Sequence, residues 1–212
     1  VFEEEFTLPK TDGSGNIRAQ LRVAKKMLEE AGWTSKGGKL VNAKTGKPFE
    51  FEILLNSPAN EKVALAFARN LGLLGIKANV RTVDPSQYES RRVNKAYDMI
   101  ISFWGHTMSP GSEQKYYWSS KAADEPGTRN YPGIKNSAVD ALCDDITAAT
   151  CRKDLITAIR ALDRALLAHH LIIPIGHKTK DYIAYWNKLE HPQFGPEGIP
   201  NFTMWWMKKA QN

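Results

Sequence analysis

The feature that most constrains the fold is an alternation of strand-like and helix-like patterns between residues 49 and 104. The strand-like segments alternate in polarity or form short apolar runs, whereas the helix-like segments place apolar side chains three or four residues apart. Strands joined through helices in this order form a parallel sheet with right-handed crossovers. The sequence therefore predicts an α/β fold with a β-α-β-α-β core and a mostly parallel sheet. The predicted strands are 49–56, 76–82 and 98–104, and the predicted helices are 60–74 and 84–95.

Local signals set the boundaries of the two helices in this core. Asn60 is expected to cap the first helix, and Gly75 is placed to end it. Asp84 followed by Pro85 is typical of a helix start, because aspartate caps the helix and proline fits its first turn.

The segments before the core follow the same logic. An amphipathic helix is expected from Ile17 to Ala31, and Gly32 is placed to end it. A further strand is expected at 39–42, and the turn-rich residues 43–48 join it to the first strand of the core.

A pair of helices is expected after the core. A short helix at 113–118 comes first, and Ser137 with Asp140 then fits a capping box that opens the first helix of the pair. The second helix must end before Pro174. The remaining tail, 175–212, is rich in Pro, Gly and aromatic residues, and it is strand-like around residues 182–186.

Composition excludes several classes of protein. The content of hydrophobic residues, 42%, and the mean hydropathy of −0.44 are typical of a soluble globular protein. No apolar run approaches the length of a membrane span. The net charge of +6 could favour nucleic acid, but Lys and Arg are scattered along the chain, so no nucleic-acid partner is expected. The chain opens with neither Met nor a signal peptide, so a processed or cut chain is expected.

The cysteines leave one question open. Cys143 and Cys151 would lie roughly 12 Å apart along one continuous helix, which is too far for a disulfide. A break near residues 149–150 would allow a bridge. Since no His cluster lies near the two cysteines, no metal site is expected there. His169, His170 and His177 are interpreted as a helix C-terminus, where His suits the dipole.

The most informative candidate for a site follows the strand at 98–104. This apolar run is expected to be buried on both faces, and at Gly105 it gives way to a polar loop without periodicity. Ligands of open α/β sheets bind outside the carboxyl ends of the strands, so the loop from Trp104 to Ser112 is expected to face a ligand. No phosphate loop, dinucleotide fingerprint or nucleophile elbow is present, so no cofactor is expected. The alternative to a non-enzymatic binding site is the active site of a metal-dependent hydrolase that uses His106 and Glu113.

Five ordered segments resemble the family of peptide-binding solute receptors of bacterial ABC importers, extracytoplasmic solute-binding protein family 5. The sequence that follows the tryptophan, SPGSEQ, looks most like the Yej-type subgroup. The segments are RAQLRVAKKMLEEAGW, AFARNLGLLGIKANVRTVDPSQYESR, AYDMIISFWG, RNYPGIKNSAVDALCDDI and ALDRALLAHHLIIPI.

The resemblance covers only the C-terminal part of the family. It implies a periplasmic-binding-protein-like (type II) C-terminal lobe at 1–174 and a tail at 175–212 that crosses back toward a missing N-terminal lobe. It also implies a non-enzymatic, periplasmic protein that captures a peptide between two lobes and delivers it to ABC permease subunits. The isolated chain could form a swapped homodimer through its tail.

The resemblance also implies the residues that bind the ligand. Many relatives have an acidic residue shortly after the tryptophan that pairs with the amino terminus of the peptide, and this chain has residues 106–109 there instead. Asn130 and Tyr131 match a motif near the cleft. The predicted ligand-binding residues are Trp104, Gly105, His106, Thr107, Met108, Ser109, Asn130 and Tyr131.

Overall fold

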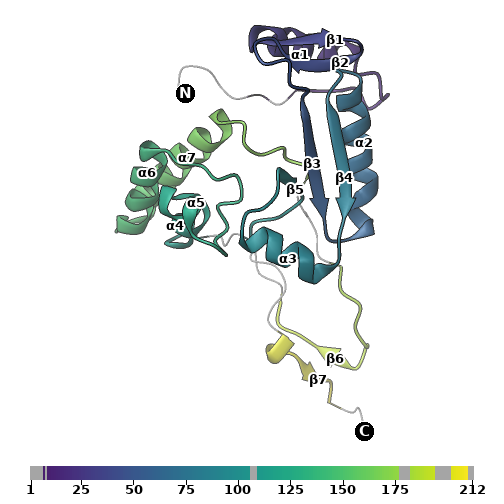
Figure 1. Ribbon diagram of the computed structural model, residues 1–212. Helices are drawn as coiled ribbons and strands as arrows, with labels where there is room; N and C mark the ends of the chain where they lie inside the picture. Colours follow the sequence, from purple (N-terminus) through teal and green to yellow (C-terminus); the bar gives the residue numbers. More distant parts are fainter. Residues whose placement is uncertain (1–6, 8, 106–108, 177–181, 194–201, 210–212) are drawn as a thin grey trace.

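A three-stranded parallel sheet forms the predicted core of the protein (Figure 1). The computed structural model describes residues 7, 9–105, 109–176, 182–193 and 202–209. The central strand is β3 (Glu50–Leu55), which pairs with β4 (Lys77–Thr82) on one side and β5 (Met99–Ile100) on the other. The α/β class and the parallel arrangement are therefore confirmed.

Helix α2 (Glu61–Gly72) covers one face of this sheet (Figure 1). Its Ala64 packs with Ile53 and Leu55 of β3, because alternate side chains of a strand point to the same face. The predicted cap at Asn60 is wrong, since its side chain makes no capping hydrogen bond. Ser57 instead caps a preceding 3-10 turn, η1 (Pro58–Asn60), because its hydroxyl accepts a hydrogen bond from the amide of Ala59.

Helix α3 (Pro85–Val93) connects β4 to β5 and starts as predicted. The Asp84 carboxylate accepts hydrogen bonds from the amides of Ser86 and Gln87 at 3.0 and 2.9 Å. The strand that follows is much shorter than predicted, because β5 pairs with β3 only through Met99 and Ile100. The expected burial on both faces is also wrong, since both residues are half-buried and Phe103 is 76% exposed.

The N-terminal part forms one end of the molecule (Figure 1). Helix α1 (Arg18–Glu30) ends before Gly32 as expected, and it has no fully buried residue. An antiparallel hairpin of β1 (Trp33–Lys36) and β2 (Lys39–Asn42) follows. Strand β1 was not predicted, because its polar residues carry no apolar alternation.

Four helices form a separate core beside the sheet (Figure 1). The predicted capping box at Ser137 is wrong: Asn136 caps the third of these helices by accepting hydrogen bonds from the amides of Ala138 and Val139. The Asp140 carboxylate accepts hydrogen bonds from the amide and hydroxyl of Ser120 instead. The helices are α4 (Glu113–Trp118), α5 (Ser120–Asp124), α6 (Ser137–Ala148) and α7 (Arg152–Ala168).

Both cysteines are free. The helix does break between α6 and α7, but Cys143 is completely buried in the helical core whereas Cys151 is exposed at the start of α7. His169 lies at the C-cap of α7, as interpreted from the sequence, and His177 lies outside the described residues.

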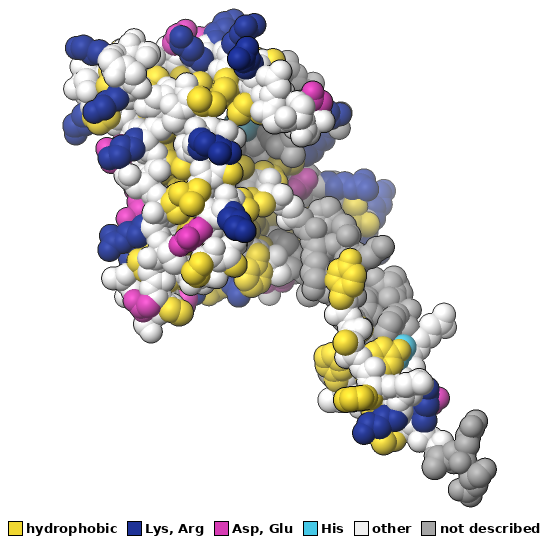
Figure 2. Space-filling view, turned by 90° about the vertical axis from the view of Figure 1, so that its right-hand side faces the viewer, with side chains coloured by type: hydrophobic (Ala, Val, Ile, Leu, Met, Phe, Trp, Pro, Cys, Tyr) yellow, Lys and Arg dark blue, Asp and Glu magenta, His cyan; other side chains and the backbone are white. Residues whose placement is uncertain are grey.

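The described strands of the tail lie away from the sheet and the helices (Figures 1 and 2). Its strands β6 (Leu189–Glu190) and β7 (Trp206–Met207) pair with each other, and a 3-10 turn, η2 (Phe202–Met204), precedes β7. The strand expected around residues 182–186 is wrong for the described residues. Nowhere in the described part of the chain is a helix both long and apolar enough to cross a bilayer.

Candidate ligand-binding site

Trp104 lies where the chain leaves the sheet and meets the helical core. Its ring stacks on Trp118 at a centroid distance of 5.1 Å and tilts against Tyr131 at 5.2 Å. The indole nitrogen donates a hydrogen bond to the carbonyl of Arg129 at 3.1 Å. These contacts leave Trp104 half-buried. Its side chain therefore packs against the helical core and still has an accessible surface. We call Trp104, Trp118 and Tyr131 the aromatic cluster.

The predicted loop begins beside the aromatic cluster. Gly105 is exposed, and its carbonyl accepts a hydrogen bond from the hydroxyl of Tyr117 at 3.1 Å. Ser109 is also exposed. The predicted site residues His106, Thr107 and Met108 lie outside the described residues.

Glu113 closes the turn at the far end of the loop. Its carboxylate accepts hydrogen bonds from the amide of Gly111 at 2.8 Å and from the side chain of Gln114 at 3.2 Å. Among the described residues, no group of three or more His, Cys, Asp or Glu could hold a metal ion. The pairing of His106 with Glu113 that a hydrolase would need involves a residue outside the described part.

Asn130 is completely buried, and its side chain bonds only to main-chain groups in the described structure. Its amide nitrogen donates to the carbonyls of Ser119 and Ile134 at 2.9 and 3.0 Å. Its amide oxygen accepts from the amide of Ile134 at 3.0 Å. Both amide hydrogens are thus committed to shaping the loop that carries Tyr131.

Tyr131 joins the helical part to α3. Its hydroxyl accepts a hydrogen bond from Arg92 at 3.1 Å, and its carbonyl accepts one from the hydroxyl of Tyr97 at 2.9 Å. The hydrogen bond from Arg92 to Glu89 raises the pKa of that guanidinium, which therefore stays charged. Burial raises the pKa of Tyr97 to about 12, so its hydroxyl keeps its proton and donates.

Lys95 is a second link between the two parts. Its ammonium donates to the carbonyls of Ala122 and Ala123 at the end of α5 and to the hydroxyl of Thr128. Burial lowers the pKa of this amine. No sequence pattern predicts the roles of Arg92, Lys95 and Tyr97, because their partners lie 27 to 39 residues away and no local spacing signals the contact.

The described part of this site suits binding rather than proton transfer. It offers aromatic surface, and aromatic faces pack well on apolar side chains and rings. It also offers the loop that carries Tyr131, whose shape is fixed by hydrogen bonds that involve Asn130, Arg92 and Tyr97. Such a rigid surface loses little conformational entropy when a ligand binds.

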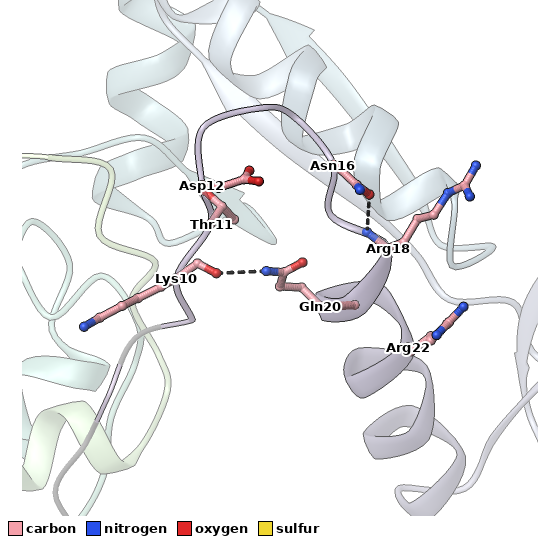
Figure 3. Close-up of a pocket in the computed structure, with 8 residues that line it drawn as sticks. Lys10, Thr11, Asp12, Asn16, Arg18, Gln20 and Arg22 are labelled. Atoms are coloured by element: carbon pink, nitrogen blue, oxygen red, sulfur yellow. Dashed lines mark hydrogen bonds between the residues drawn. The ribbon is translucent and has the colours of Figure 1, made fainter.

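A pocket of about 420 Å³ lies elsewhere, at the N-terminal end of α1 (Figure 3). It lies between residues 10–16 and the first turns of the helix, and the side chain of Gln20 donates to the carbonyl of Lys10 at 2.8 Å across it. None of the predicted site residues lines this pocket.

The chain is similar in sequence to bacterial binding proteins. The family described as bacterial extracellular solute-binding proteins, family 5 Middle, matches residues 5–126. The probable peptide-binding protein YejA of Agrobacterium fabrum (strain C58 / ATCC 33970) is 41% identical over 100% of this chain and 35% of that protein. The peptidoglycan-binding protein YepA of the same organism is 36% identical over 97% of this chain and 33% of that protein.

The fold is similar to that of solved binding proteins. The oligopeptide-binding protein AppA from Bacillus subtilis, solved in complex with a nonapeptide, superposes with a TM-score of 0.66 at 22% identity. The superposition covers 89% of this chain and 37% of AppA. The chain thus spans about a third of the length of the curated relatives that it matches.

Proposed function

The chain belongs to family 5 of the bacterial extracellular solute-binding proteins, and from that premise we propose that it is part of the peptide-binding component of an ABC importer. The observation that carries this proposal is the 41% identity to a probable peptide-binding protein, because it extends over the whole chain. The component would work outside the cytoplasm, in the periplasm, and deliver its peptide to permease subunits in the membrane.

In this proposal, residues 1–174 are the C-terminal lobe and residues 175–212 cross toward a second lobe. Two observations support the division: the relatives are about three times as long as this chain, and the tail exposes large apolar side chains. Tyr182 is 91% exposed, and Trp186 is 76% exposed. A second lobe would cover such surface, which monomeric proteins rarely leave in water.

The peptide would lie against the aromatic cluster and the loop that follows Trp104. Trp104 and Tyr131 would supply aromatic contacts, whereas Asn130 would act by fixing the loop, since its amide is fully hydrogen-bonded. Residues 105–109 would supply main-chain and polar contacts. Peptides are commonly held through their main chain, and roomy pockets accept their side chains.

Trp104→Ala tests this site in a version of the protein that includes the second lobe. Affinity for a bound oligopeptide, measured by isothermal titration calorimetry, should fall by roughly 1–3 kcal/mol, as loss of a large aromatic contact usually does. Phe103→Ala is the matched control, because Phe103 is the neighbouring aromatic residue and makes no described contact with the cluster. Equal affinities of Trp104→Ala and the unmodified protein, both folded, would remove Trp104 from the site.

Fragments of peptidoglycan are a second candidate ligand. The 36% identity to a peptidoglycan-binding protein favours them, because it covers 97% of this chain. Such fragments carry sugars beside a peptide, and aromatic rings offer flat apolar faces to both. Titration with one peptide, free and attached to its sugar, separates the candidates. Tighter binding of the sugar-bearing form would favour the second candidate, and indifference to the sugar would favour plain peptides.

A further inference from the structure

The positive charge of the chain is concentrated at one end of the molecule. Residues 18–47, which form α1, the β1–β2 hairpin and the loop after it, contain eight of the 29 Lys and Arg residues but only two of the 23 Asp and Glu residues. This segment, which we call the basic tip, therefore carries a formal charge of +6. The rest of the chain holds 21 residues of each sign, so the net charge of the whole chain equals that of the basic tip.

All eight basic side chains of the tip are exposed. Lys25 and Lys26 lie 3.9 and 3.7 Å from the tip's two acidic residues on the same helix, in solvent-exposed pairs of little strength. The other six have no ion pair among the described residues. They are Arg18 and Arg22 on α1 and Lys36, Lys39, Lys44 and Lys47 on the hairpin and the loop after it.

Helix α1 also exposes apolar side chains in the same region. Val23 is 61% exposed and Met27 is 63% exposed, and they lie one turn apart on the helix. None of the residues of α1 is fully buried. Figure 2 shows Lys and Arg side chains together with hydrophobic ones over the upper end of the molecule, where Figure 1 places α1 and the hairpin.

The pocket at the start of α1 adds a recess to this surface (Figure 3). Lys10, Arg18 and Arg22 line it, against a single acidic residue, Asp12. The Asp12 carboxylate is already engaged, because it accepts hydrogen bonds from the hydroxyl and amide of Ser14, and these bonds lower its pKa. The recess is therefore suited to an anionic group rather than to a cation.

We propose that the basic tip binds the surface of a lipid bilayer that contains anionic phospholipid. Exposed lysines near such a surface each contribute about 1 kcal/mol of attraction. An amphipathic helix with basic residues and exposed apolar side chains can lie in the interface and bury the apolar ones among the acyl chains. A receptor that delivers its ligand to a membrane-embedded permease would gain from being concentrated at that membrane.

The pattern of the tip favours lipid over other anions. Six of its eight cations are lysines, which act as flexible point charges, whereas recognition of a fitted phosphate or carboxylate usually relies on the planar fork of arginine. The exposed Val23 and Met27 have no role in a purely electrostatic complex with nucleic acid. In a bilayer they would be removed from water.

Flotation of the full chain with vesicles tests the proposal. The vesicles are phosphatidylcholine alone or phosphatidylcholine mixed with phosphatidylglycerol, at about 0.1 M and 1 M salt. We expect binding only to the mixed vesicles, and weaker binding at high salt. The triple variant Lys26→Gln/Lys36→Gln/Lys44→Gln should lower the partition coefficient roughly 100-fold. The matched control Lys62→Gln/Lys121→Gln/Lys153→Gln, which removes the same charge from exposed lysines elsewhere, should lower it much less.

The variant Val23→Ser/Met27→Ser separates lipid from other polyanions. It should weaken binding to mixed vesicles several-fold but leave any binding to a DNA duplex unchanged. The proposal is overturned by failure to bind mixed vesicles, by equal binding to neutral vesicles, or by equal losses in the two lysine variants. It is also overturned if the apolar variant binds vesicles as well as the unmodified chain. Circular dichroism melts establish that each variant is folded, and no peptide is present, so the result is independent of the proposed transport function.

Discussion

The thiol of Cys143 is completely buried between α4 and α6, and it donates a long hydrogen bond to the carbonyl of Gln114 at 3.6 Å. Burial raises its pKa from 9.0 to about 11, because a thiolate would be desolvated there. The folded protein thus holds this proton more tightly than the unfolded chain does. The resulting contribution to stability is complete below pH 9 and is lost as the pH rises from 9 to 11.

We predict that the free energy of unfolding falls by roughly 1–3 kcal/mol more between pH 9 and 11 in the unmodified protein than in Cys143→Ala. Urea unfolding followed by circular dichroism measures this difference. The titration of Tyr97 contributes to both proteins in nearly the same range and cancels in the comparison. As a control, a thiol reagent at about pH 8 should label Cys151 quickly and Cys143 only on unfolding. Parallel pH profiles would contradict the assignment.

The position and contacts of Trp104 could be predicted from the sequence only in part. The sequence predicted Trp104 at the end of a strand, but β5 already ends at Ile100, and Trp104 lies beyond it, where the chain meets the helical core. The sequence did not predict that its ring would stack on Trp118, because that partner belongs to a helix whose docking depends on tertiary contacts. Asn130 was selected through a motif, and only the structure shows its amide committed to three main-chain groups.

At the scale of elements, the turn between α2 and β4 depends on Gly75. Its φ of +80° lies in the left-handed region, and a Cβ atom there would lie 2.7 Å from the amide nitrogen of Leu40. Gly75→Ala should therefore destabilise the protein by at least about 1–2 kcal/mol, since both the backbone conformation and the close approach oppose it. Thermal unfolding measures the effect.

Gly72→Ala is the matched control for that turn. Gly72 is the last residue of α2, and a Cβ atom there would meet no atom within 4 Å. Since alanine favours the helix over glycine, this substitution should be neutral or should stabilise by up to about 1 kcal/mol. A similar loss of stability in both variants would show that the turn does not require glycine specifically.

The start of α6 offers a second test at this scale. Asn136→Ala should cost about 1–2 kcal/mol, because two main-chain amides lose their capping acceptor. Ser137→Ala, at the position expected from the sequence to be the cap, should change the free energy of unfolding by less than about 0.5 kcal/mol. Urea unfolding of the two variants compares them directly. The reverse order of effects would restore the capping box.

Some helices and strands could be predicted from the sequence, and others could not. Helix α2, strand β4 and helix α3 were predicted, since apolar periodicity and local breakers determine them. Strand β1 and the hairpin of the tail carry no such period and were missed. Strand β5 was predicted too long because its apolar run resembles a buried strand, whereas only Met99 and Ile100 find a partner on β3 and the chain then turns to the helical core.

At the scale of the whole molecule, the two ends of the molecule differ in the side chains that they expose. The basic tip lies at one end, and strands β6 and β7 of the tail lie at the other (Figure 1). The tail exposes aromatic side chains such as Tyr182 and Trp186. Between the two ends, Arg92, Lys95 and Tyr97 tie the sheet to the helices through hydrogen bonds. Within the tail, the described hydrogen bonds join its own residues, as those from Trp206 to Glu190 and from Lys208 to Asn187 do, and its strands pair with each other.

We therefore expect the tail to drive self-association of the isolated chain. Trp186 and Phe202 are 76% and 66% exposed, and a second copy could cover them through a swapped dimer. Light scattering should find the 212-residue chain as a dimer or larger species, and a chain of residues 1–174 as a monomer. The truncated chain should keep its melting temperature within a few degrees, because none of the described tail residues belongs to either hydrophobic core. If the 212-residue chain is a monomer at concentrations where the truncated chain is also a monomer, the prediction of a dimer is wrong. A large drop in the melting temperature of the truncated chain would instead show that the tail stabilises its own lobe.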